Sequence, residues 1–392
     1  MPVTPLSGLT ILEFTHTVMG PSCGMVLADL GADVIRVEPA PDGDRTRRLH
    51  GFATGFFVYF NRNKRCVCID LKSPAGLDVA KDMVRNADAL IENFGPGTMD
   101  RLGLGWDTVH ELNPRLVYLA MKGFLPGPYE HRPSLDELAQ FMTGLAYMTG
   151  PPGQPLRAGS SVIDIMGGVM GVIGLLAALR QRDRDGIGRK VTSSLFESSA
   201  FLVAQHMAGE AATGIAPPPM PARKGAWGIY ETFPTRNGEK LFIGITSDNH
   251  WRTFCDKFDR SDLFADARFA TNADRVTNRP ALREYVAKIA LQHDIATLER
   301  MLDEANIPFS PVRTPSDLFD DPQLNAHGRM LPVRMPHGNV AKLPTTPICF
   351  GVEAPELRRQ PPAAGEHTGE VLRALGYSAT QIAALRSSGA VS

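Results

Sequence analysis

The sequence predicts an α/β protein: a large domain built on a parallel sheet, followed by a smaller α+β domain. Short apolar segments alternate with amphipathic ones over the first half of the chain, and the texture changes after a proline-rich stretch. Such alternation is typical of a sheet with helices on both faces. With 392 residues, the chain is long enough for two or three domains.

The first segments predict a strand–helix–strand unit. Residues 10–14 (TILEF) have the pattern of a short buried strand, 21–30 that of a helix ending at Gly31, and 33–38 that of the next strand. The unit implies parallel strands joined by a right-handed crossover, as in Rossmann-like domains. Its first turn lacks the GxGxxG of dinucleotide sites, so no nicotinamide cofactor is expected.

The alternation continues to residue 213, where the large domain is predicted to end. Further strands are expected at 66–71, 89–94, 115–121 and 189–196, and helices at 75–87 and 165–182. A proline-rich linker follows at 214–226.

The small domain is predicted over 227–325. It opens with a hairpin whose turn is Asn237-Gly238, a dipeptide favoured in two-residue turns. Helical patterns follow at 248–258, 280–292 and 294–305. Residues 326–392 are expected to form a return linker and terminal helices that pack on the large domain.

Composition narrows the classes of partner. Lys and Arg total 41 and Asp and Glu 42, a balance that argues against nucleic acid or an anionic membrane. The most apolar run, 165–179, is shorter than the ~20 residues of a membrane span. The five cysteines have no CxxC spacing, which disfavours a metal site. Reduced thiols and the absence of a signal-peptide pattern indicate a cytoplasmic protein.

Asp164 is the strongest candidate for chemistry. It follows the polar segment RAGSSVI and stands at the start of the predicted helix 165–182. An aspartate in this place is most often an N-cap. A helix N-terminus also favours an ionised carboxylate, and a carboxylate can attack a thioester carbonyl. Four small residues behind it would admit a ligand or another backbone: Gly167, Gly168, Gly171 and Gly174.

Other candidates lie on loops after predicted strands, where open α/β sheets bind ligands. In NFGPGTMDRLG (93–103), Phe94 could stack on a base and Arg101 could meet a phosphate; the alternative is a Gly-Pro turn before an ordinary helix. His16 occupies the first such loop. The basic cluster NRNKR (61–65) has the composition of a solvated surface segment.

Six separated motifs, in order, resemble those of the type III CoA-transferases, the formyl-CoA transferase-like family. They are PLSGLTILEF, LADLGADVIRVEP with GDRTR, NRNKRCVCIDLKSPAG, IENFGPGTMDRLG, SVIDIMGGVMGVIGLLAAL and GEHTGEVLRALGYS. The resemblance implies that Asp164 carries the acyl group through a mixed anhydride and an aspartyl-CoA thioester. It also implies acyl-CoA and a carboxylic acid as substrates, no tightly bound cofactor or metal, and an interlocked homodimer.

The resemblance also assigns residues to the site. CoA binding is expected at His16, Thr17, Ile69, Lys72, Asn93, Phe94, Gly95 and Arg101. Substrate binding is expected at Val18 and at Asp136, which matches an acidic position beside the active site. Three arginines on loops are candidates to hold a second substrate carboxylate: Arg132, Arg157 and Arg223.

Departures from the family pattern bear on the substrate. Formyl-CoA transferases have Gln at the position of Val18, a CoA-contacting Arg at that of Pro39, and a Gly-rich loop where this chain has RKGAWGIY (223–230). An oxalate enzyme is therefore not expected. The hypothesis is a short dicarboxylyl donor such as succinyl-CoA.

Two alternatives remain open. The α-methylacyl-CoA racemases resemble this chain throughout but have a proton-exchanging His directly before the Asp of SLDELAQ, where this chain has Leu135. The other alternative is a non-catalytic acyl-CoA-binding protein, against which the retention of Asp164 argues.

Overall fold

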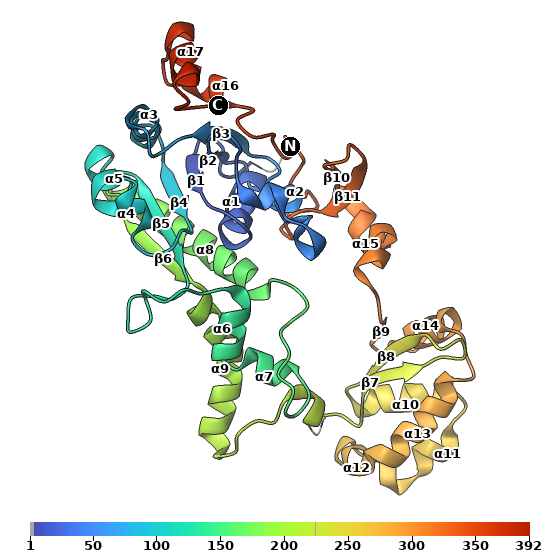
Figure 1. The fold of residues 1–392 in the computed structure, drawn as a ribbon. Helices are drawn as coiled ribbons and strands as arrows, with labels where there is room; N and C mark the ends of the chain where they lie inside the picture. Colours follow the sequence, from blue (N-terminus) through green and yellow to red (C-terminus); the bar gives the residue numbers. More distant parts are fainter. Residues whose placement is uncertain (1–3, 224) are drawn as a thin grey trace. The chain divides into compact units, whose positions relative to one another are not determined.

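The fold was obtained as a computed structural model, which describes residues 4–223 and 225–392 (Figure 1). The chain divides into two compact units, Met1–Pro221 with Pro322–Ser392, and Ala222–Asp321. The smaller unit is therefore inserted into the larger one, because the chain leaves the larger unit and later returns to it.

A six-stranded parallel sheet is the frame of the larger unit, and it confirms the predicted α/β class. Its strands, in the order β3-β2-β1-β4-β5-β6, are Arg65–Ile69, Asp33–Pro39, Thr10–Phe14, Ala89–Glu92, Val117–Lys122 and Lys190–Ser194. The strand order reverses between β1 and β4. A ligand crevice forms outside the carboxyl ends of the strands at such a switch point.

Helices cover both faces of this sheet (Figure 1). One face packs on α1 (Met19–Asp29) and α8 (Val162–Asp185), and the other on α3 (Pro74–Arg85) and α5 (Trp106–Leu112). Successive side chains of a strand point to opposite faces of the sheet. Ile11 therefore packs in the apolar core on the α1 and α8 face, and Leu12 and Phe14 pack in the core on the α3 and α5 face.

Helix α8 is longer than the sequence pattern indicated, and it is long and apolar enough to cross a membrane by length and composition alone. It packs on α1, β5, β6 and α9 (Leu195–Thr213). A Cβ at Gly168 would lie 2.6 Å from the carbonyl oxygen of Met19, so the glycine is what allows the α1 backbone to approach. The small residues behind Asp164 therefore serve helix packing.

The smaller unit has a three-stranded antiparallel sheet of β7 (Ile229–Pro234), β8 (Lys240–Ile245) and β9 (Phe309–Pro311). The β7–β8 hairpin turns through Asn237-Gly238, as predicted, with Gly238 at φ 84°. Its helices are α10 (Asp248–Lys257), α11 (Ser261–Ala265), α12 (Asn272–Thr277), α13 (Arg279–Ala290) and α14 (Ile295–Glu304).

The last segment differs from the predicted linker. It contains α15 (Pro322–Asn325) and a hairpin of β10 (Met330–Arg334) and β11 (Val340–Pro344). Helices α16 (Thr368–Ala374) and α17 (Ala379–Ser387) follow, and their apolar side chains join the core on the α3 face of the sheet. The remaining helices of the larger unit are α2 (Phe56–Phe60), α4 (Thr98–Arg101), α6 (Asp136–Met142) and α7 (Leu145–Thr149).

Candidate active site

A buried ion network fixes the loop that follows β2. The guanidinium of Arg36 is completely buried, and it donates hydrogen bonds to Glu13 Oε1 at 2.6 Å, to Glu38 Oε1 at 2.9 Å and to Asp44. The guanidinium of Arg47 also pairs with Glu38, and its Nε lies 2.7 Å from Glu38 Oε2. Carboxylates from β1, β2 and the loop therefore bind one cation, and these bonds hold the loop against the sheet.

This loop in turn holds the first loop of the sheet. Asp44 accepts a hydrogen bond from the backbone N–H of Thr46, and the Thr46 hydroxyl accepts one from the N–H of Thr17 at 3.0 Å. Thr17 has φ 64°, a left-handed conformation that is unusual for a threonine. Such backbone strain persists only where the surroundings impose it, and it concentrates at functional sites.

The first four residues of the segment NRNKR are buried, contrary to the expectation of a solvated surface. Arg62 and Lys64 have no exposed surface. Arg62 pairs with Asp29 at 2.7 Å, and Lys64 Nζ lies 2.8 Å from Glu13 Oε2. The buried carboxylates of Asp29 and Glu13 draw these cations inward, because an unpaired buried charge is costly.

The loops after β1 and β4 meet at the switch point. The Asn93 side chain accepts a hydrogen bond from the His16 N–H at 2.9 Å and donates one to the His16 carbonyl at 3.0 Å. The ring of His16 stacks on that of Phe94, with centroids 5.8 Å apart. The loop containing His16 and the loop containing Asn93 and Phe94, both singled out in the sequence, therefore form one wall of the site.

Three adjoining cavities follow this edge of the sheet. The first, of about 380 Å³, is lined by residues that include Ile69, Lys72 and Thr98; the second, of about 700 Å³, has Pro39 and Arg45 in its wall. The third, of about 410 Å³, contains Asp164. Phe94 lines all three cavities, so they adjoin one another, and together they are called the trough.

Most of the residues predicted for the site line this trough. In the first cavity are Ile69, Lys72 and Phe94, in the second His16 and Thr17, and in the third Val18, Asn93, Gly95, Arg132, Asp136, Arg157 and Asp164. Arg223 belongs to the smaller unit.

Arg101 and Arg45 lie differently with respect to the three cavities. Arg101 is exposed, donates to the Thr98 hydroxyl at 2.9 Å, and is not among the residues that line the three cavities. Arg45, which the prediction missed, lines both the first and second cavities. Its motif, GDRTR, places a cation directly after the Asp44 that Arg36 fixes, and this was the available signal.

Asp164 is the third residue of α8 and not its N-cap. Ser161 occupies the cap position without a side-chain cap hydrogen bond. The Asp136 carboxylate, from the first turn of α6, accepts the N–H groups of Ile163 at 2.8 Å and Asp164 at 3.0 Å. The capping role that the sequence suggested for Asp164 is therefore filled by a carboxylate from another helix.

The electrostatic setting of Asp164 also differs from the expectation. Burial raises its pKa from 3.8 to about 7, the negative charges of Asp136 and Glu137 add to this rise, and the positive charge of Arg157 opposes it. The helix N-terminus was expected to keep the carboxylate ionised. Desolvation and the two acidic neighbours are the larger effects, so Asp164 changes charge near neutral pH.

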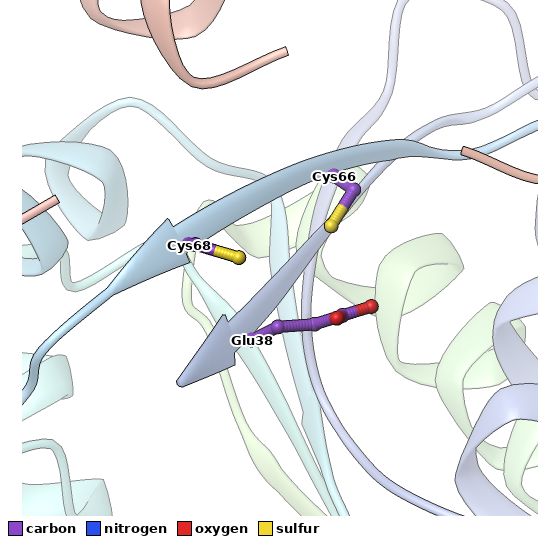
Figure 2. Close-up of side chains that lie close together, drawn as sticks. All are labelled: Glu38, Cys66 and Cys68. Atoms are coloured by element: carbon purple, nitrogen blue, oxygen red, sulfur yellow. The ribbon is translucent and has the colours of Figure 1, made fainter. Parts of the chain in front are cut away.

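Glu38, Cys66 and Cys68 form the one cluster of potential metal ligands found in the described part of the chain (Figure 2). Both Glu38 oxygens are already used, by Arg36, by Arg47 and by the N–H of Asp44. Two adjacent guanidinium groups oppose a metal cation electrostatically. The cluster therefore belongs to the buried ion network.

Comparison with known proteins agrees with this geometry. The family model described as CoA-transferase family III matches residues 6–368. The chain belongs to CoA-transferase family III. This enzyme is 31% identical to a succinate–glutarate CoA-transferase of Agrobacterium fabrum over 95% of this chain and 96% of the relative. It is also 31% identical to a formyl-CoA:oxalate CoA-transferase of Rhodopseudomonas palustris, over 98% and 97%.

Solved structures show the same fold. A CAIB/BAIF family protein from Brucella suis matches with TM-score 0.84 and 31% identity, covering 95% of this chain and 99% of that one. The protein Rv3272 from Mycobacterium tuberculosis matches with TM-score 0.80 and 27% identity, covering 94% and 99%. CoA thioesters are the substrates of this class of enzyme, so the trough is where one is expected to bind.

The raised pKa of Asp164 predicts a pH-dependent difference in stability between the wild type and Asp164→Asn. The folded state binds the Asp164 proton more tightly than the unfolded state, so the wild type loses stability as pH rises from about 4 to about 7. The variant has no such loss. Its melting temperature relative to the wild type should therefore climb across this window and level off above it. A difference that is independent of pH would contradict the raised pKa.

Proposed function

We propose that this CoA-transferase moves CoA from a short dicarboxylyl-CoA, such as succinyl-CoA, to a carboxylic acid, with Asp164 as the nucleophile. The observation that carries the proposal is the trough, because it joins Lys72 at one end to Asp164 at the other. CoA is a long ligand with an anionic nucleotide end and a reactive thioester end. A trough with a cation at one end and a carboxylate at the other matches it.

The nucleotide is assigned to the first cavity. Ile69 and Leu71 offer apolar contact for the adenine, and Lys72 and Arg45 offer charge for the phosphates. Arg45 supplies a cation beside Pro39, where the family pattern has an arginine. The pantetheine arm follows the second cavity past His16 and Thr17.

The chemistry then takes place in the third cavity. The Asp164 carboxylate attacks the thioester carbonyl, the C–S bond breaks, and a mixed anhydride and CoA thiolate result. The thiolate attacks the aspartyl carbonyl, which releases the donor acid and leaves an aspartyl-CoA thioester. The acceptor carboxylate attacks this thioester and forms a second anhydride. The thiolate then takes the acyl group from that anhydride and frees Asp164.

Arg132 supports a dicarboxylyl substrate. Of the cations that line the third cavity, Lys122 is held by Glu92 and Arg157 by Glu137. Arg132 contacts the Tyr129 ring at 4.8 Å, and among the described residues it has no carboxylate partner. The second carboxylate of a substrate would supply the ion-pair partner that Arg132 lacks. One relative, from Haloarcula hispanica, is a succinyl-CoA:mesaconate CoA-transferase, 32% identical over 95% of this chain and 96% of its own.

We also propose a homodimer in the cytoplasm. Ile173 on α8 and Phe201 on α9 are 58% and 66% exposed, and a second copy of the chain would remove these large apolar side chains from water. Because α8 also carries Asp164, a second copy covering these side chains would lie against the element that holds the nucleophile. The five free cysteines, four of them buried, fit a reducing compartment.

The nucleophile is tested by Asp164→Asn. The amide keeps the shape of the side chain but cannot form the anhydride, so transfer should fall to background while thermal stability is preserved or increased. Hydroxylamine should inactivate the wild type only after incubation with an acyl-CoA. Substantial transfer by a fresh Asn variant, with deamidation excluded by peptide mass, would refute the mechanism.

The substrate assignment is tested by Arg132→Ala. Loss of a charge-assisted hydrogen bond should cost about 1.5–3 kcal/mol, roughly a 10- to 150-fold loss in kcat/KM with succinyl-CoA. Acetyl-CoA lacks the second carboxylate and should be affected little. Arg252→Ala, on α10 of the smaller unit, is the matched control. An equal loss with both donors would remove Arg132 from substrate recognition.

The dimer is tested by Ile173→Glu. A charge on a covered apolar face should dissociate the subunits, and analytical ultracentrifugation should show the mass falling from two chains to one. Gln181→Glu, exposed on the same helix, adds the same charge and should leave the dimer intact. A wild type that sediments as a single chain would overturn the assembly.

A further inference from the structure

Glu137 and Arg157 form an ion pair in the wall of the third cavity. Glu137 belongs to the first turn of α6, and Arg157 to the segment that leads into α8. The same guanidinium donates to the carbonyl oxygens of Ala158 at 2.9 Å and Ser160 at 3.2 Å. One side chain thus joins α6 to the entry of the helix that carries Asp164.

The two members of the pair act on Asp164 in opposite directions. The negative charge of Glu137 raises the pKa of Asp164, and the positive charge of Arg157 lowers it. Their charges cancel in the assembled pair only if both lie at comparable distances from Asp164. Any change to one member leaves the other unbalanced beside the nucleophile.

The other ionisable side chains that line the cavity are His16, Lys122, Arg132 and Asp136. Lys122 is bound to Glu92, and the Asp136 carboxylate accepts the first amides of α8. His16 bonds Thr17 and stacks on Phe94. Burial and the Asp136 charge raise the pKa of Asp164 more than Glu137 does, and the Glu137–Arg157 pair is a partly exposed, internally balanced pair of charges in the same cavity wall.

We propose that Glu137 and Arg157 are a pair of positioning residues that holds two opposite charges in the cavity wall beside Asp164 and so sets how readily that carboxyl group ionises. The inference rests on the proposed function of Asp164. A carboxylate attacks a thioester and a carboxylic acid does not. The proton that leaves Asp164 passes to solvent before attack.

The experiment compares pH profiles of kcat/KM for Glu137→Gln and Arg157→Gln. Removing the nearby negative charge should move the midpoint of the acidic limb down by roughly 0.5–1 pH unit, and removing the positive charge should move it up by a similar amount. Arg157→Lys keeps the charge and should restore the wild-type midpoint. Glu130→Gln, on the preceding loop, removes a charge outside the cavity lining and should leave the midpoint unchanged.

A second readout separates this inference from the proposed function. Each substitution is combined with Asp164→Asn, and the pH dependence of the resulting melting-temperature difference reports the Asp164 titration without any turnover. Opposite shifts in both readouts support the pair. An unmoved titration in the stability measurement overturns it. A shifted titration in an enzyme whose Asp164→Asn variant remains active would overturn the nucleophile and leave the pair's effect on Asp164 established.

Discussion

The site depends on one buried guanidinium, that of Arg36. Burying an ion costs several kcal/mol, and the cost is recovered only when partners surround it with good geometry. Here three cations (Arg36, Arg47 and Lys64) meet three carboxylates (Glu13, Glu38 and Asp44). The balance fixes the loop after β2, and that loop imposes the strained backbone of Thr17. A rigid trough wall follows from charge pairing rather than from apolar packing.

The charge of Asp164, in contrast to that of Arg36, is poorly stabilised by its surroundings. The N–H groups at the start of α8 would have stabilised its anion, but the Asp136 carboxylate accepts them and adds a negative charge of its own. Burial removes water as well. The Asp164 anion is therefore left poorly stabilised while its neighbours are satisfied, and a more basic carboxylate bonds more strongly to an acyl carbon. Asp164, whose anion is poorly stabilised, is therefore held by neighbours whose own charges and hydrogen-bonding groups have partners.

Features that depend on local sequence pattern were predicted correctly from the sequence. Features that depend on charges far away along the chain were not. Apolar periodicity predicted the sheet and its helices, and Asn237-Gly238 predicted its turn, because both depend on near neighbours. The burial of Arg62 and Lys64 depends on partners more than thirty residues away. The cap of α8 likewise comes from Asp136 on another helix. Motif resemblance reached Asp164 and Phe94, but no local pattern predicted that the three cavities adjoin.

Helix α8 unites these requirements in one element. Its glycine face must be narrow, because Gly168 lets the backbone of α1 approach. Its first turn must stop at the cavity, so that Asp164 lies in the cavity wall. Its outer face exposes Ile173, the side chain that we assign to a second copy. These three demands leave few positions for charge between Asp164 and Arg180, and they explain why a helix that brings Asp164 to the cavity has the composition of a membrane span.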